Sequence, residues 1–155
     1  MSAHERIILS AQGYFELEMN KEAIAELDKL PLADQLRPDV LEMRVLILMK
    51  DQRWREALSA SEKLCAVAPQ IPIGFIHAAY CLHEMGQTRE AKELLLEGPA
   101  SLVNDATYHY NLACYECALG NLEAARAYLK ASLAMDEKLG EFAKTDPDLS
   151  PLQVS

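Results

Sequence analysis

Four stretches of the chain repeat one pattern of residues at a fixed interval of 34 positions. They read LEMNKEAIAEL at 17–27, DQRWREALSAS at 51–61, MGQTREAKELL at 85–95 and LGNLEAARAYL at 119–129. A fixed period of this length is typical of proteins that stack one small structural unit several times. The period therefore predicts a repeat protein, whatever the rest of the sequence contains.

An alanine occupies the same place in every stretch, at Ala23, Ala57, Ala91 and Ala125. Protein interiors are packed densely, so only a small side chain fits where two helices approach closely. In a stacked repeat the same contact recurs in each unit. The four alanines therefore predict one close helix contact per unit.

Each unit contains two stretches with apolar residues at helical spacing, separated by a short polar or glycine turn. In the third unit the first stretch spans about 73–85, the turn is Gly86 and Gln87, and the second stretch spans about 88–96. Pro38, Pro69 and Pro72 lie between units. A proline disfavours the helical conformation of the residue before it, so each of them marks a break between helices. The pattern predicts an all-α chain of antiparallel helix pairs.

These units resemble the tetratricopeptide repeat (TPR) family, which has a 34-residue period and a W-x2-L-G-x2-Y, A-x3-F, P pattern. In the third unit the matching positions are Phe75, Ala78, Ala79, Leu82, Ala91 and Leu95. The resemblance implies a right-handed superhelical solenoid formed by one domain, residues 1–155. The expected repeats are about 4–37, 38–71, 72–105 and 106–137.

Three residues depart from the family pattern. Arg44 occupies the place of a leucine, Val45 is bulky where the family prefers glycine, and Glu116 stands where an aromatic residue is usual. These departures predict weaker helix contacts in the second and fourth units, while the period itself is unchanged.

A C-terminal cap is expected at 138–155, after the last repeat. Leu139, Phe142 and Ala143 share one helical face there, and terminal repeats need a segment that covers their exposed apolar side. Asp146 followed by Pro147 has the pattern of an N-cap with proline at the first helical position, and it predicts a further short turn anchored by Leu149 and Leu152.

Composition narrows the classes of partner. The chain has 155 residues with 24 acidic and 15 basic side chains, which gives a formal net charge of -9. Such a surface repels phosphate backbones and anionic lipid, so neither nucleic acid nor a membrane is an expected partner. No apolar run approaches the roughly 20 residues that cross a bilayer, so a cytoplasmic protein with free thiols is expected.

The sequence lacks the motifs that carry common catalytic chemistry. It contains no glycine-rich phosphate loop, nucleophile elbow or His-Glu metalloprotease motif. Acidic pairs such as Glu22 and Glu26 fall on polar helix faces, where solvated surface is the simpler interpretation. We therefore expect no enzyme activity, no catalytic residues and no cofactor.

One group of residues suggests an alternative as a metal-dependent or thiol-dependent regulator. Cys114 and Cys117 share a helix face, and His77 and His83 lie in the preceding unit, with His83 in register with Cys117. A free cysteine is also among the residues most often buried as a small apolar side chain. Plain packing is the interpretation we adopt, with no metal site expected.

In the TPR family the first helix of each pair lines a concave face, and the register here assigns residues to that face. The chosen partner-binding residues combine apolar, aromatic and adaptable side chains: Phe15, Leu46, Met49, Ile76, His77, Tyr80, His83, Tyr110, Asn111 and Cys114. Some TPR domains hold a terminal carboxylate with basic residues and asparagine on these helices. Here only Asn111 fits that clamp, so an extended or helical apolar peptide is the expected ligand.

The functional hypothesis is a non-catalytic protein-protein interaction module that binds a peptide or protein segment in its concave groove. A secretion-type chaperone for an apolar client segment is the alternative within the same class. A terminal helix of the chain itself folding back into the groove is a further possibility. The sequence does not determine the oligomeric state or the identity of the partner.

Overall fold

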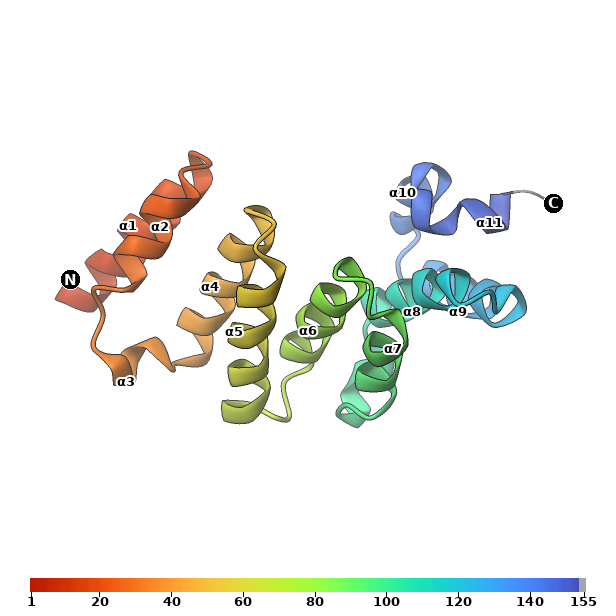
Figure 1. The fold of residues 1–155 in the computed structure, drawn as a ribbon, viewed down its shortest axis with the longest axis horizontal. Coiled ribbons are helices and arrows are strands. Elements are labelled where there is room, and N and C mark those ends of the chain that lie inside the picture. The colour runs from red at the N-terminus through yellow and green to blue at the C-terminus, as the bar shows by residue number, and fades with distance from the viewer. Residues whose placement is uncertain (154–155) are drawn as a thin grey trace.

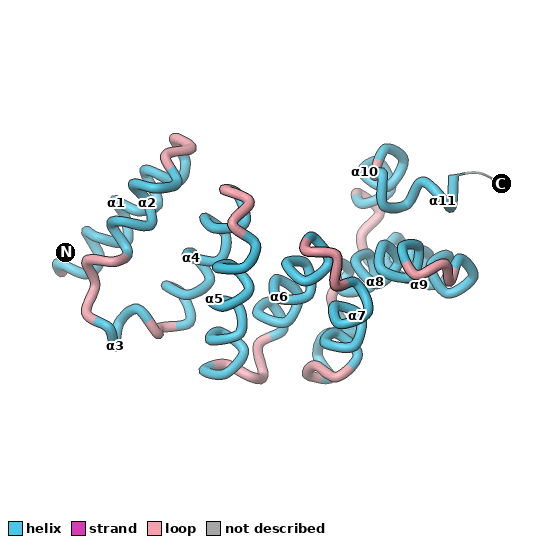
Figure 2. The backbone as a smooth tube through the Cα atoms, in the orientation of Figure 1, coloured by secondary structure: helices cyan, strands magenta, loops and turns pink. Residues whose placement is uncertain are grey.

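Helices follow one another through residues 1–153, the part of the chain that the computed structural model describes (Figures 1 and 2). Short loops connect them, and no strand occurs in this part. The elements are α1 (Ala3–Glu16), α2 (Asn20–Leu27), α3 (Leu32–Gln35), α4 (Pro38–Lys50), α5 (Trp54–Val67), α6 (Pro72–Glu84), α7 (Thr88–Leu96), η1 (Ala100–Asn104), α8 (Ala106–Ala118), α9 (Leu122–Met135), α10 (Leu139–Thr145), η2 (Pro147–Leu149) and α11 (Ser150–Gln153).

The helices form successive pairs that stack into an elongated solenoid, which confirms the predicted all-α fold class (Figure 1). Within residues 1–153 the pairs are α1 with α2, α4 with α5, α6 with α7, and α8 with α9. The second helix of one pair also contacts the first helix of the next, so the stack is continuous. The alanines at 23, 57, 91 and 125 are all 0% exposed, as close helix contacts require.

The turn inside each pair repeats with the same period. Glu18, Gln52, Gly86 and Gly120 have φ between 57° and 83°, the left-handed conformation that commonly ends a helix. The amide N–H one residue later donates to a carbonyl five residues back in every case, for example from Gln87 to Leu82 at 2.8 Å. This closure satisfies carbonyls that the helix end would otherwise leave free.

The second helices alternate in length. α2 and α7 have 8 and 9 residues, whereas α5 and α9 each have 14. Each short helix is followed by a proline, Pro31 or Pro99, and then by a single helical turn, α3 or η1. Because Pro31 and Pro99 are 68 residues apart, the structural period is two helix pairs rather than one.

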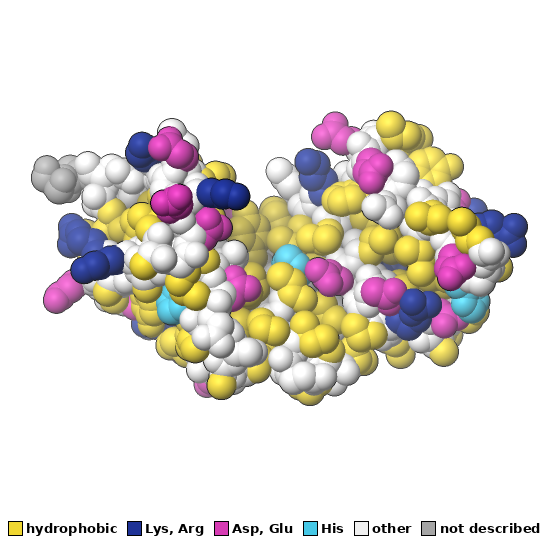
Figure 3. Space-filling view, turned by 180° about the vertical axis from the view of Figure 1, so that it is seen from behind, with side chains coloured by type: hydrophobic (Ala, Val, Ile, Leu, Met, Phe, Trp, Pro, Cys, Tyr) yellow, Lys and Arg dark blue, Asp and Glu magenta, His cyan; other side chains and the backbone are white. Residues whose placement is uncertain are grey.

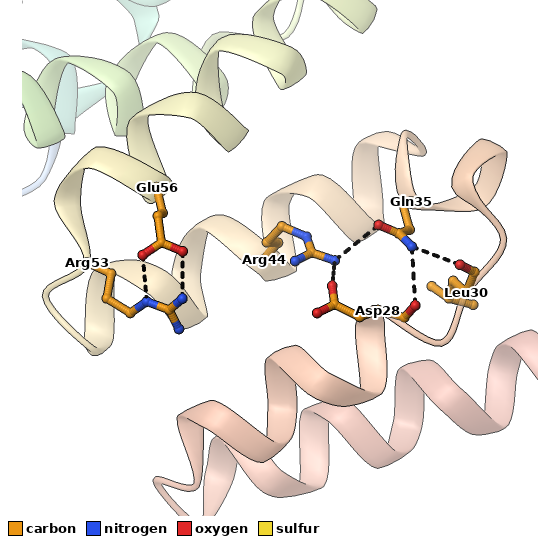
Figure 4. Close-up of polar contacts among 6 residues, drawn as sticks. All are labelled: Asp28, Leu30, Gln35, Arg44, Arg53 and Glu56. Atoms are coloured by element: carbon orange, nitrogen blue, oxygen red, sulfur yellow. Dashed lines mark hydrogen bonds and ion pairs between the residues drawn. The ribbon is translucent and has the colours of Figure 1, made fainter.

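The first short turn explains why an arginine stands where the tetratricopeptide pattern has a leucine. Arg44 on α4 donates to Asp28 at 2.8 Å and to the Gln35 side chain at 3.5 Å (Figure 4). Gln35 in turn donates to the backbone carbonyl of Leu30 at 2.8 Å. These contacts connect α4 to the segment that follows α2, so Arg44 replaces an apolar contact with polar ones.

Glu116, which stands where the repeat pattern has an aromatic residue in the fourth unit, also has polar partners. Its side chain is 5% exposed, and one carboxylate oxygen lies 3.0 Å from Lys92 Nζ and 3.2 Å from Asn121 Nδ2. A buried charge needs such partners, because removal from water is costly. The ion pair joins α7 to α8.

The chain after α9 forms the C-terminal segment, residues 139–153. α10 and α11 contact α9, and η2 lies against α8 (Figure 1). Asp146 caps η2 by accepting from the Asp148 amide at 3.0 Å, and Leu149 is fully buried. Phe142 differs from the prediction: it is 62% exposed rather than part of the covering face. Residues 154 and 155 of the expected cap lie outside the described part.

None of the helices within residues 1–153 combines the length and the apolar character needed to cross a membrane.

Candidate interaction surface

The first helices of the pairs, α1, α4, α6 and α8, lie side by side and together form what we call the concave face. The space-filling view shows a hollow between the end that carries the C-terminal segment and the end formed by α1 and α2, with hydrophobic side chains along it (Figure 3). α4, α6 and α8 pack against their own second helix and against helices of neighbouring pairs, so the concave face is the side on which a partner can reach them.

Exposure along the concave face decreases from the N-terminal to the C-terminal end. Gln12, Leu46, Tyr80 and Cys114 occupy equivalent positions at intervals of 34 residues. Gln12 is exposed, Leu46 is 38% exposed, Tyr80 is half-buried and Cys114 is 5% exposed. The open part of the face therefore lies over α1, α4 and α6, and the part over α8 is covered.

The structure separates the predicted site residues into two groups. Phe15, Met49, His77, Tyr80 and His83 are half-buried and Leu46 is exposed, so these six border the face. The other four are buried, in contrast to the expected open groove: Ile76, Tyr110, Asn111 and Cys114. The reason is that η2 covers α8 and the Phe142 ring of α10 lies beside Tyr110, while Ile76 packs into the core between α6 and α8.

Two side-chain contacts hold the C-terminal segment on this face. The Tyr110 hydroxyl donates to Asp146 Oδ2 at 2.6 Å, and His83 Nε2 lies 3.1 Å from Asp148 Oδ2. The other ring nitrogen of His83 lies 2.9 Å from the Thr88 hydroxyl. A terminal segment of the chain therefore does fold onto the groove, which was one of the alternatives. It covers the groove only where η2 lies on α8, and not along the whole face.

A cavity of about 250 Å³ remains between the segment and the helices below it. Tyr80 and His83 of α6 line one side, and Tyr110, Asn111, Cys114 and Tyr115 of α8 line another. Leu139, Phe142, Asp146 and Asp148 of the C-terminal segment close it, with Thr107 at the edge.

Burial controls the ionisation of these groups. Burial first, and then the nearby carboxylates, raise the pKa of Tyr80 to about 12 and that of Tyr110 further. The same causes raise the pKa of the Cys114 thiol well above 9.0. Burial likewise raises the pKa of Cys65 to about 11 and that of Cys81 to about 12. These thiols are therefore protonated near neutral pH and are poor nucleophiles.

The cysteines and histidines do not come together as the metal hypothesis requires. All four cysteines are free. Within residues 1–153, no three His, Cys, Asp or Glu side chains are arranged to hold a metal ion. His83 contacts Thr88 and Asp148, whereas His77 has a buried Nε2 without a hydrogen-bond partner.

Sequence reasoning missed the long-range side-chain contacts of two carboxylates, Asp146 and Asp148. The Asp-Pro pattern indicated Asp146 as a cap. The contact of Asp146 with Tyr110, however, joins residues 36 positions apart, and that of Asp148 with His83 joins residues 65 positions apart. Position in the repeat could not reveal these contacts, because the C-terminal segment does not continue the repeat. Its carboxylates were the only signal, and no lysine or arginine lines the cavity that they border.

Comparisons with known proteins identify the fold. No family profile and no curated protein sequence matches the chain. The structure is similar to "MamA MSR-1 C2", at 16% identity and a TM-score of 0.72, over 89% of this chain and 82% of that one. It is also similar to "Crystal structure of MamA", at 15% identity and a TM-score of 0.76, over 88% of this chain and 80% of that one. "MamA RS-1 ArsTM double mutant" gives a TM-score of 0.76 at 14% identity, over 86% and 75%.

Proposed function

We propose that the chain is a non-catalytic protein-interaction domain whose open concave face, over α1, α4 and α6, binds a segment of another protein. The observation that supports this most is Leu46, a large apolar side chain 38% exposed at the centre of the face. Met49, about one turn further along α4, and Tyr80, at the equivalent position of α6, are only half-buried. Apolar and aromatic side chains gathered in a hollow are typical of surfaces that bind peptides or helices.

The C-terminal segment provides an intramolecular example of such binding. It occupies the α8 part of the face with one buried leucine, Leu149, and two side-chain hydrogen bonds. The face can therefore hold a short helical segment by an apolar anchor and flanking polar contacts. We expect a partner segment on α4 and α6 to bind in the same manner, with an apolar residue against Leu46.

The net charge of -9 supports a protein rather than a nucleic acid or anionic lipid as the partner. A secretion-type chaperone for an apolar client is a second candidate, because Met43 and Met49 lie about one turn to either side of Leu46 on α4 and methionine adapts to varied apolar shapes. A chaperone of this kind would tolerate changes in the client's apolar residues, whereas a specific partner would not.

The test is site-specific crosslinking in the native cell. A photoreactive amino acid at Leu46 should capture the partner, whereas the same amino acid at Val67 should not. Val67 is 45% exposed on the second helix α5, so the two positions match in exposure but lie on different helices of the pair.

Affinity measurements with the captured partner then decide. Leu46→Glu should weaken binding at least tenfold, about 1.4 kcal/mol, while Val67→Glu should leave it unchanged. Equal losses for both variants, or loss for Val67→Glu alone, would contradict the proposed surface.

A further inference from the structure

The cavity beneath the C-terminal segment does not include Leu46, and the binding proposed above assigns it no ligand. At about 250 Å³ it is smaller than the pockets of roughly 300–1,000 Å³ that take drug-sized ligands. It is large enough for one long side chain or a small amine. Its rim includes the exposed residues Thr107, Phe142 and Asp148, so a ligand can enter from solvent.

Aromatic rings form much of the cavity wall. Tyr80, Tyr110, Tyr115 and Phe142 all line it, and the Tyr110 and Phe142 ring centroids are 5.9 Å apart. The faces of aromatic rings attract cations that lie within about 6 Å of the ring centroid. Such walls also pack against the alkyl chain that carries the charge.

The charges that line the cavity are acidic. Asp146 and Asp148 border it, and no lysine or arginine does. Within the described residues neither carboxylate pairs with lysine or arginine, and His83 is the only potentially cationic partner, at Asp148. Burial, then the hydrogen bond to Asp146 at 2.6 Å and the charge of Asp146, raise the pKa of Tyr110, as expected for a ring beside acidic groups.

One buried polar group beside the cavity lacks a partner. Tyr115 is 1% exposed, and its hydroxyl has no hydrogen-bond partner among residues 1–153. Asn111 is 9% exposed and lines the same cavity with its polar side chain. Buried polar groups are almost always hydrogen-bonded, so an unpartnered hydroxyl at this cavity points to a polar ligand.

We propose that this cavity binds an alkylammonium group, with its alkyl chain between the aromatic rings and its nitrogen facing the Asp148 carboxylate. The Asn111 side-chain oxygen and the Tyr115 hydroxyl oxygen accept hydrogen bonds from the ammonium. His83 positions Asp148 through the contact between Nε2 and Oδ2, which leaves Oδ1 for the ligand. Tyr80 belongs both to the open part of the concave face and to this cavity, but the groups proposed to hold the ammonium, Asp148, Asn111 and Tyr115, lie on α8 and the C-terminal segment, so the site does not depend on a protein partner at Leu46.

The full chain can be titrated with small probes while the side-chain amide signals of Asn111 are followed by NMR. The cationic probes are Nα-acetyl-lysine-N-methylamide, which represents a peptide side chain, and cadaverine, which represents a free diamine. Nα-acetyl-norleucine-N-methylamide has a similar alkyl chain without the charge. Saturable shifts of Asn111 with either cation, and none with norleucine, are the expected result. The tighter cation identifies the source of the ligand.

Matched variants separate a ligand contact from a structural role. Tyr115→Phe should weaken binding of the preferred cation at least fivefold, while its thermal midpoint stays equal or rises because a hydroxyl without a partner is removed. Tyr108→Phe, at a buried tyrosine of α8 that does not line the cavity, should bind like the parent. Equal shifts with norleucine, no saturation with either cation, or unchanged affinity in a folded Tyr115→Phe variant would overturn the proposal.

Discussion

Equivalent residues in the four turns adopt the same left-handed backbone conformation although their side chains differ. The left-handed conformation at positions 86 and 120 is occupied by glycine, which adopts it without steric cost. Positions 18 and 52 have the same conformation with glutamate and glutamine, at φ of 60° and 57°. A side chain with a Cβ in this conformation costs about 1–2 kcal/mol. The first two turns are therefore strained relative to the last two.

Gln52→Gly should stabilise the protein by about 0.5–1 kcal/mol, because relief of the left-handed strain exceeds the extra freedom that glycine gives the unfolded chain. Gly86→Ala is the matched reverse change and should destabilise it by about 1 kcal/mol. Gln52 is exposed, and a Cβ at Gly86 would meet no heavy atom within 4 Å, so the effects mainly report the backbone. Urea unfolding of both variants measures them, and a destabilising Gln52→Gly would contradict the argument.

His77 makes stability depend on pH. Burial lowers its pKa from 6.5 in the folded chain, and its buried Nε2 has no partner within residues 1–153. Below pH 6.5 the unfolded chain takes up a proton that the folded chain resists, so the free energy of unfolding falls as the pH falls. Above 6.5 the contribution is constant.

His77→Gln should remove this dependence. Thermal midpoints of parent and variant at pH 7.5 and 5.5 should show a smaller loss for the variant on acidification. Because the other histidines and the carboxylates are common to both proteins, the difference between the two losses isolates His77. Equal losses would mean that His77 titrates alike in the folded and unfolded chain.

Among the helices, α8 has the most complete burial, since every residue from Tyr110 to Cys117 is buried. α7 and α9 cover it within the stack, and η2 covers the concave side. This burial includes a charge, Glu116, which depends on Lys92 of α7. The contact between α7 and α8 is therefore sensitive to one side chain.

Lys92→Met should lower the free energy of unfolding by about 1–3 kcal/mol, because it leaves a buried carboxylate with only Asn121 as a donor. Adding Glu116→Leu should recover most of the loss, since the double change removes the unpaired charge as well. Chemical unfolding of the two variants is the measurement. If Glu116→Leu deepens the loss in the Lys92→Met background, the carboxylate has another role.

The helices were predictable because they follow the repeat. Apolar spacing and the four alanines identified the fold class, and the alanines are fully buried as expected. The short α7 agrees with the predicted stretch at about 88–96, whereas the shortening of α2, which Pro31 follows, was not predicted. The burial of Tyr110, Asn111 and Cys114 was not predicted either, because it depends on where the C-terminal segment lies. A register describes which residues share a face, but it does not say what covers that face.

At the scale of the whole molecule, the two halves of the concave face differ. Over α4 the face is open at Leu46, and over α8 it is covered by the chain's own segment. The largest group of buried apolar residues lies in the covered half and includes Leu149 and Ala143. The C-terminal segment is thus part of the core of that half, and its removal should act on stability rather than simply lengthen the groove.

Deletion of residues from Leu139 onward should therefore destabilise the α8–α9 pair and promote self-association. The deletion exposes Cys114 and Cys117, leaves the Tyr110 hydroxyl without Asp146, and empties the position of Leu149, a residue whose truncation to alanine alone should cost about 2–5 kcal/mol. Newly exposed apolar surface of this kind drives association. Sedimentation shows the change in mass, and chemical unfolding shows the loss of stability.

Two point variants separate packing from the mere presence of the C-terminal segment. Leu149→Ala should reproduce part of the loss of stability, while Glu141→Ala, at an exposed site of α10, should change it by less than about 0.5 kcal/mol. If the deleted protein stays monomeric and unfolds like the parent, the segment is not part of the core. In that case the α8 half of the concave face would be as available to a partner as the half around Leu46, and the binding surface would span all four first helices.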